Sequence, residues 1–83
     1  MLSEIESILP NLSKAESKVA AYVLKNPKLT ISRHIGELSK EIGVSEPTII
    51  RFCRTLGLDG YKSFKLRLAQ SMPRQSNQLL VDI

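Results

Sequence analysis

Two arginines three positions apart carry the most specific chemistry that this sequence offers. Arg51 and Arg54 lie in segment 46–56, where apolar residues recur at helical spacing, so both would project from one side of a helix. Arginine can donate two hydrogen bonds to the O6 and N7 atoms of guanine in the major groove of DNA. A solvated charged face is the alternative, because charged side chains mostly lie exposed on any helix.

A helix with one buried side would position these arginines. Its apolar stripe follows the spacing i, i+3, i+4 and i+7 and consists of Ile49, Phe52, Cys53 and Leu56. We expect the helix to begin near Glu46, with Ser45 as its cap and Pro47 in the first turn, where backbone amides lack partners. Gly57 predicts its end, and Leu58 can make the apolar contact that often accompanies such a cap.

A shorter helix is predicted just before this one. Ile35, Leu38 and Ile42 fall at helical spacing, and Gly43 follows where a left-handed residue would end the helix. Val44 lies in the turn and can be buried between the two helices. Two short helices joined by a tight turn are typical of a helix-turn-helix, whose second helix enters the major groove.

The N-terminal part of the chain is also predicted to be helical. Ser3 and Glu6 have the spacing of a capping box for a first helix, whose aliphatic stripe is Leu2, Ile5, Ile8 and Leu9. A second capping box, at Ser13 and Glu16, begins a longer helix that Asn26-Pro27 would end.

The remaining segments complete the predicted fold. Pro10-Asn11 should end the first helix, and residues 28–33 should form a connector or a single turn. Asp59-Gly60 is a turn that can cap a final helix, whose apolar residues are Tyr61, Phe64 and Leu68. We therefore predict an all-α domain of five helices, a homeodomain-like helix-turn-helix without a wing.

The positive charge of the chain is concentrated in one part. Residues 45–74 contain six Lys or Arg and two acidic residues, which accounts for the whole net charge of +4. Localised positive charge suits a polyanion such as DNA, because each neutralised phosphate releases condensed counterions. A basic surface that only aids solubility is the alternative.

Several other classes of protein find no support in the sequence. Cys53 is the only cysteine and lies on the predicted buried stripe, and His34 is the only histidine, so neither a disulfide nor a metal site is expected. We find no phosphate-cradling glycine loop and no nucleophile paired with a base, so we expect neither an enzyme nor a cofactor. Because neither a secretory signal nor a membrane span is visible, we expect a cytoplasmic protein.

The character of the chain changes after Ala69. Residues 71–78 are polar, include Pro73 and show no apolar period, which is typical of a linker. Residues 79–81 are apolar again but too few to fold alone. We expect a domain over residues 1–72 and a linker over 73–83 that leads to a further domain. A short tail that packs back on the domain or on a partner is the alternative.

Three segments together resemble the N-terminal domain of RpiR-family bacterial transcriptional regulators. They are residues 12–24 with Asn26-Pro27, residues 43–57 and residues 60–69. The resemblance covers residues 1 to about 72 and is strongest with the hexose-metabolism repressors of that family. It implies a C-terminal sugar isomerase domain, absent from this sequence, that binds a phosphosugar effector and controls the affinity for DNA.

The same resemblance implies a set of residues that contact DNA. It places six residues at the groove: Ser45, Glu46, Pro47, Thr48, Arg51 and Arg54. Four lysines are candidates for phosphate contacts, which position a protein without specifying sequence: Lys14, Lys18, Lys62 and Lys65. Ser45 is better suited to capping the helix, whereas Thr48 could cap it or bind phosphate. Glu46 could accept from a cytosine amine, but we prefer a role at the helix N-terminus.

Two functions from different classes follow from these observations. The first is a sequence-specific DNA-binding domain of a regulator, a repressor of carbohydrate metabolism, with double-stranded operator DNA as its partner. The second is a protein-interaction or dimerisation module on a helix-turn-helix scaffold. RNA binding is not favoured, because no aromatic stacking platform is visible. We also expect a homodimer in which the aliphatic stripe of residues 2–9 packs partly against a second copy, with packing inside its own domain as the alternative.

Overall fold

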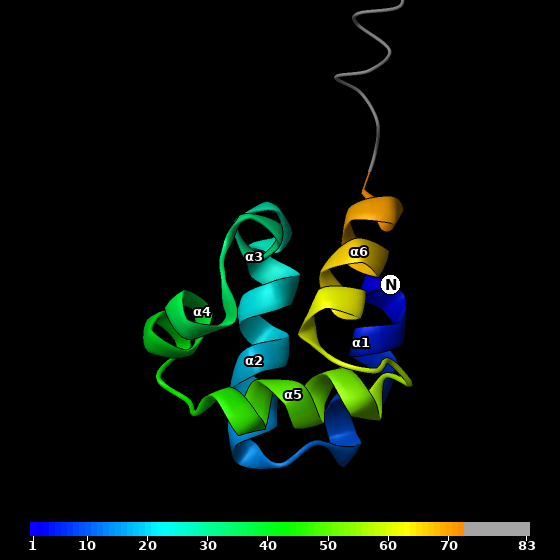
Figure 1. Ribbon diagram of the computed structural model, residues 1–83. Helices are drawn as coiled ribbons and strands as arrows, with labels where there is room; N and C mark the ends of the chain where they lie inside the picture. Colours follow the sequence, from blue (N-terminus) through cyan, green and yellow to red (C-terminus); the bar gives the residue numbers. More distant parts are fainter. Residues whose placement is uncertain (73–83) are drawn as a thin grey trace, which may run out of the picture.

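Helices make up most of the computed structural model, which describes residues 1–72 (Figure 1). The elements in chain order are α1 (Leu2–Ile8), the 3-10 turn η1 (Leu9–Asn11), α2 (Lys14–Lys25), α3 (Pro27–Ser32), α4 (Ile35–Ile42), α5 (Glu46–Thr55) and α6 (Tyr61–Ser71). Residues 1–72 contain no β-strand, so the prediction of an all-α domain without a wing is confirmed. The linker expected at 73–83 lies outside the described residues.

The described residues form six α-helices where we predicted five, because segment 28–33, expected as a connector or a single turn, is mostly helical. Residues 28–32 belong to α3, in which Pro27 occupies the first turn, where a missing amide costs nothing. Asn26 ends α2 and directly precedes α3, so the Asn-Pro pair both ends one helix and begins the next. The buried Thr30 hydroxyl donates to the Asn26 carbonyl at 2.8 Å and supports this short helix.

One of the two predicted capping boxes is present. The Glu16 amide donates to Ser13 Oγ at 3.2 Å, and the Ser13 amide donates to the Glu16 carboxylate at 3.5 Å. The box expected at Ser3 is absent, because α1 already begins at Leu2 with Met1 as its cap. Downstream, Pro10 lies inside η1, so the chain tightens into a 3-10 turn where we expected the helix simply to end.

The core lies where the helices cross. In Figure 1, α5 runs across the lower end of α2, while α1 packs against α2 and α6 packs against α3 and α5. The fully buried apolar side chains come from every α-helix except α3, and they are Ile5, Val19, Ala20, Val23, Leu38, Ile49, Phe52, Cys53, Phe64 and Leu68. The predicted stripe of α5 is therefore confirmed at its first three positions, while Leu56 is only half-buried.

The aliphatic stripe of α1 faces this core. Ile5 is fully buried, and the other members, Leu2, Ile8 and Leu9, are partly buried against the same cluster. This arrangement favours the alternative in which the first helix packs within its own domain.

None of the helices in residues 1–72 is long and apolar enough to cross a membrane.

Truncation of Ile5 tests how firmly α1 is part of the core. We expect Ile5→Ala to lower the free energy of unfolding by about 2–5 kcal/mol, because it removes buried methyl groups and leaves a cavity. Urea unfolding followed by circular dichroism measures the change. Leu66→Ala is the control, since Leu66 is 60% exposed and its loss should cost less than about 0.5 kcal/mol. Equal effects of the two substitutions would show that α1 is not anchored in the core.

Candidate nucleic-acid interface

A tight turn joins α4 and α5. Gly43 has φ of 86°, a left-handed conformation that glycine adopts without steric cost. The amides of Gly43 and Val44 both donate to the Ser39 carbonyl, at 2.8 and 3.1 Å, and so close the last turn of α4. Val44, which we expected to be buried between the two helices, is half-buried against the core. This turn fixes the direction in which the chain enters α5.

The N-terminus of α5 is closed by side chains. Ser45 Oγ accepts from the Thr48 amide at 3.3 Å, and the two hydroxyl oxygens lie 2.8 Å apart within hydrogen-bonding distance. Ser45 therefore caps the helix, the role that we preferred for it, and the Thr48 hydroxyl contacts this cap. Pro47 lies exposed in the first turn.

The other end of α5 is closed by backbone hydrogen bonds. Gly57, also with φ of 86°, donates to the Arg54 carbonyl at 2.8 Å, and Leu58 donates to the Cys53 carbonyl at 3.1 Å. This pair of bonds is the Schellman arrangement that the Gly57-Leu58 pair predicted. Leu58 is partly buried against the core and supplies the accompanying apolar contact.

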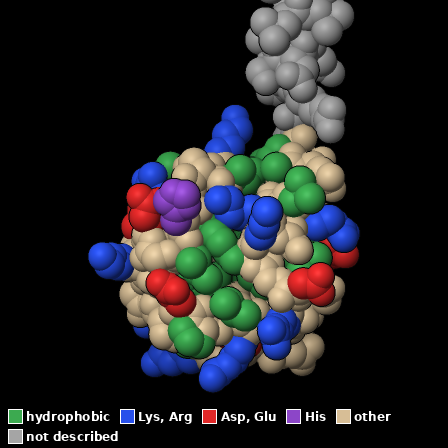
Figure 2. All heavy atoms as spheres, in the orientation of Figure 1, with side chains coloured by type: hydrophobic (Ala, Val, Ile, Leu, Met, Phe, Trp, Pro, Cys, Tyr) green, Lys and Arg blue, Asp and Glu red, His purple; other side chains and the backbone are tan. Residues whose placement is uncertain are grey.

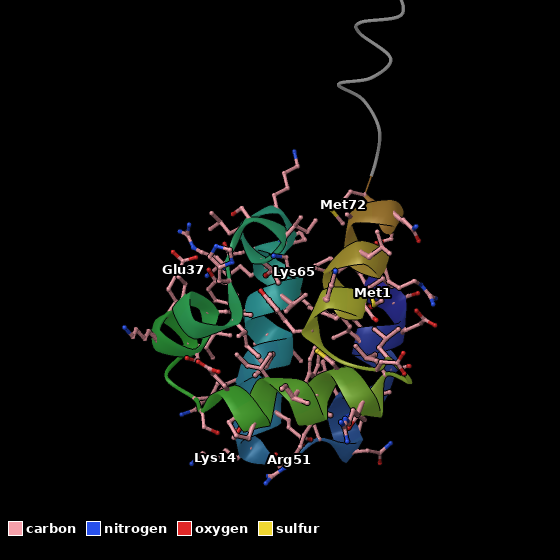
Figure 3. The ribbon with its side chains drawn as sticks, viewed as in Figure 1. Met1, Lys14, Glu37, Arg51, Lys65 and Met72 are labelled. Atoms are coloured by element: carbon pink, nitrogen blue, oxygen red, sulfur yellow. The ribbon has the colours of Figure 1, made fainter. Side chains whose placement is uncertain are left out.

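Arg51 and Arg54 are both exposed on α5, opposite its buried stripe. Within the described part of the chain, neither guanidinium forms an ion pair. Figure 3 shows Arg51 projecting from the lower edge of the domain, where Lys14 also projects from the start of α2. Because α2 packs against α5, these two side chains belong to neighbouring elements. Lys or Arg side chains gather along this same edge in Figure 2.

The four candidate lysines do not have equivalent surroundings. Lys14, Lys18 and Lys62 are exposed, as a phosphate contact requires. Lys65 is half-buried, and its Nζ donates to the Arg33 carbonyl at 3.1 Å while lying 5.3 Å from the centre of the Tyr61 ring. Figure 3 places Lys65 far from the lower edge where Arg51 projects. The structure thus gives Lys65 partners within the protein that the sequence did not predict.

Glu46 lies toward the neighbouring helix. Its Oε2 atom is so close to Gly36 of α4 that a Cβ added at Gly36 would lie 3.4 Å from it. Glu46 is also the first residue of α5, where a carboxylate interacts favourably with the helix dipole. Both observations support the role at the helix N-terminus that we preferred over a base contact.

Polar contacts that the sequence analysis missed hold α4 in place. The Glu37 carboxylate accepts from the His34 amide at 3.0 Å, and this hydrogen bond holds the pKa of Glu37 below its usual value. At the other end of α4, Glu41 pairs with the guanidinium of Arg33 and accepts from the Tyr22 hydroxyl at 3.4 Å. The His34-to-Glu37 spacing could have revealed the first contact, since it matches that of a capping box. The Glu41 contacts join residues that are far apart in the sequence, so no local sequence pattern could have predicted them.

The remaining candidate for chemistry is Cys53, which is fully buried. Burial raises the pKa of its thiol to about 12, so the thiol stays neutral and belongs to the core. Among residues 1–72, no three His, Cys, Asp or Glu side chains lie close enough together to hold a metal ion.

The fold and the exposed face of α5 define the class of helix-turn-helix domains of transcriptional regulators. The pattern described as the helix-turn-helix domain of the rpiR family matches residues 1–75. This chain therefore belongs to the rpiR family of helix-turn-helix domains.

Comparison with individual proteins agrees with this assignment. The chain is 46% identical over 72 residues to the HTH-type transcriptional regulator HexR of Pseudomonas aeruginosa, and 47% identical over 72 residues to HexR of Escherichia coli. Both alignments cover 87% of this chain and 25% of the relative, so the chain spans about a quarter of their length. Among solved structures, the N-terminal domain of the proposed transcriptional regulator ybbH from Bacillus subtilis matches with a TM-score of 0.78 and 35% identity. That match covers 82% of this chain and 83% of the other.

Substitution of Gly43 tests the turn that positions α5. We expect Gly43→Ala to lower the free energy of unfolding by about 1–2 kcal/mol, because an L-residue pays a steric cost at φ of 86°. Urea unfolding measures this change in the free energy of unfolding. Gly60→Ala is the matched control, since Gly60 has φ of 178° with open space around its Cβ position. Alanine there should raise the free energy of unfolding by up to about 1 kcal/mol. Equal losses from the two substitutions would contradict this account of the turn.

Proposed function

We propose that this chain reads operator DNA, with α5 as the recognition helix in the major groove. The observation that carries the proposal is the exposed pair Arg51 and Arg54 on a helix whose opposite face is fully buried. A helix anchored in this way presents its arginines in a fixed direction, and arginine is the side chain that bonds guanine through two hydrogen bonds. Thr48 and Pro47 complete the proposed DNA-facing surface at the N-terminal end of α5, beside the capping residue Ser45.

Phosphate contacts would come from the exposed lysines of the neighbouring helices. Lys14 and Lys18 lie on α2, which packs against α5, and Lys62 lies in the first turn of α6. Such contacts fix the register of a protein on DNA and make the affinity depend on salt.

The regulatory context is part of the same proposal. The HexR relatives are named as transcriptional regulators, and we infer that this chain acts as a repressor of carbohydrate-metabolism genes. Because the chain spans a quarter of those relatives, the response to a phosphosugar would depend on a sugar isomerase domain beyond residue 83. Residues 73–83 would be the linker toward that domain. Its action on genomic DNA would place the protein in the cytoplasm, and no enzymatic activity is proposed for it.

A homodimer is the proposed form on DNA. Two copies of a helix-turn-helix read two half-sites about one helical turn apart. The packing of α1 within its own domain makes the first helix a weaker candidate for the interface than the sequence indicated.

The second candidate function is a protein-interaction module. One observation favours it, because Leu66 and Leu29 are 60% and 43% exposed on α6 and α3, two helices that pack together. Titration of the chain with DNA separates the two functions, since an interaction module would show no preference for an operator.

Removal of the two arginines tests the proposed function. We expect Arg51→Ala and Arg54→Ala each to lose about 1–3 kcal/mol of discrimination between operator and unrelated DNA, because each removes a base contact. Fluorescence anisotropy at one fixed salt concentration measures both affinities, with DNA from upstream of the gene itself as the operator. Arg67→Ala removes an exposed arginine of α6 outside the proposed contact surface and serves as the control. Unchanged discrimination in the double variant, with helical circular dichroism intact, would contradict the assignment.

A further inference from the structure

The C-terminal end of α3 is held by side chains of α6. The Tyr61 hydroxyl lies 2.8 Å from the Arg33 carbonyl and 3.2 Å from the Thr30 carbonyl, and it donates to this pair. Lys65 Nζ donates to the same Arg33 carbonyl at 3.1 Å. The last carbonyls of a helix lack the usual amide four positions on; that of Thr30 also accepts from the Arg33 amide at 3.2 Å, and Arg33 is the residue directly after α3. The first turns of α6 therefore act as an external cap for α3.

Tyr61 and Lys65 form one unit on α6. They are four positions apart and so share a face of the helix. The ammonium group lies 5.3 Å from the centre of the Tyr61 ring, within the range of a cation–π contact. Tyr61 is half-buried, and burial raises the pKa of its hydroxyl to about 12, so the hydroxyl remains a donor at neutral pH.

Arg33 links this unit to the helix-turn-helix. It directly precedes His34, the residue that caps α4, so holding its carbonyl fixes the point where the chain enters α4. Its guanidinium pairs with Glu41 in the last turn of α4. Arg33 is thus bound by α6 through its backbone and by α4 through its side chain.

The contacts close a loop of chain around α4 and α5, the two helices of the helix-turn-helix. α6 follows α5 after a turn at residues 56–60, and it returns to Arg33, which lies two positions before the start of α4. The chain just before the helix-turn-helix is therefore hydrogen-bonded to the helix just after it, although Arg33 and Lys65 are 32 positions apart.

We propose that Tyr61 and Lys65 are positioning residues for DNA recognition, which hold the α3–α4 junction so that α4 and α5 meet DNA as one rigid unit. The inference rests on the proposed operator binding. In this proposal Lys65 acts by holding the Arg33 carbonyl and does not make the phosphate contact that the sequence predicted. Lys62 remains a proposed phosphate contact.

Two single substitutions and one matched control test this assignment. Tyr61→Phe removes only the hydroxyl, and Lys65→Gln removes the ammonium group. Each should reduce the ratio of operator affinity to non-specific affinity by about three-fold or more, the scale of one lost hydrogen bond. The slope of log affinity against log salt should not change. Lys62→Gln should show the reverse pattern, with the ratio kept and the slope smaller by about 1.

The measurement is fluorescence anisotropy on the 83-residue chain at several salt concentrations, well below the melting temperature of each variant. Circular dichroism confirms that each variant is folded. Lys65→Arg should restore the ratio, because a guanidinium can also donate to the Arg33 carbonyl, whereas a general loss of stability would not be rescued in this way. Ser7→Ala, which removes a hydroxyl that donates to the Glu4 carbonyl within α1, should leave the ratio within about two-fold.

The outcomes that overturn the inference are distinct from failure of the proposed function. A smaller salt slope in Lys65→Gln, with the ratio kept, would mean that Lys65 contacts phosphate. An unchanged ratio in Tyr61→Phe would show that the cap on α3 does not affect recognition. If the unsubstituted chain shows no preference for the operator, operator binding itself fails, and the positioning role falls with it.

Discussion

Phe52 of α5 meets Phe64 of α6 with ring centroids 5.6 Å apart and ring planes at 80°, and both rings are fully buried. This edge-to-face contact joins the proposed recognition helix to the helix that follows it. Ile49 and Cys53 extend the same buried face of α5, which packs against α2. Every exposed side chain of α5 owes its direction to this burial, because a ten-residue helix would not be stable alone in water.

The ends of α5 set the length of helix that can reach DNA. In the first turn the Thr48 amide donates to Ser45 Oγ, and in the last turn the amides of Gly57 and Leu58 donate to backbone carbonyls of the helix. Neither end depends on a distant segment. The external cap of α3 is of another kind, because Tyr61 and Lys65 join parts of the chain that are separated by α4 and α5. Local caps therefore define the helix, and the long-range contacts define its orientation in the domain.

This difference explains how much could be predicted from the sequence. The helix-turn-helix followed from Gly43, Ser45 and the apolar period of α5, because glycine, capping residues and periodicity act over a few positions. α3 was missed because six residues show fewer than two helical periods, and because the Asn26-Pro27 pair was interpreted only as an end. Lys65 was assigned to phosphate because its partner is a backbone carbonyl 32 positions away, which leaves no mark in the local pattern. Lys14, Lys18 and Lys62 are exposed as that prediction requires, and their contacts with DNA stay predictions.

The central claim is that α5 lies in the major groove with its arginines on guanine edges. Methylation interference tests it most directly, because methylation at guanine N7 blocks the atom to which arginine donates. Operator DNA is methylated at random and mixed with the chain. The frequency of methylation at each base is then compared between the bound and the free DNA. We predict that methylated guanines in each half-site are depleted from the bound fraction, and that Arg51→Ala or Arg54→Ala removes the depletion at particular guanines. Depletion confined to adenines methylated at N3, in the minor groove, would contradict the account.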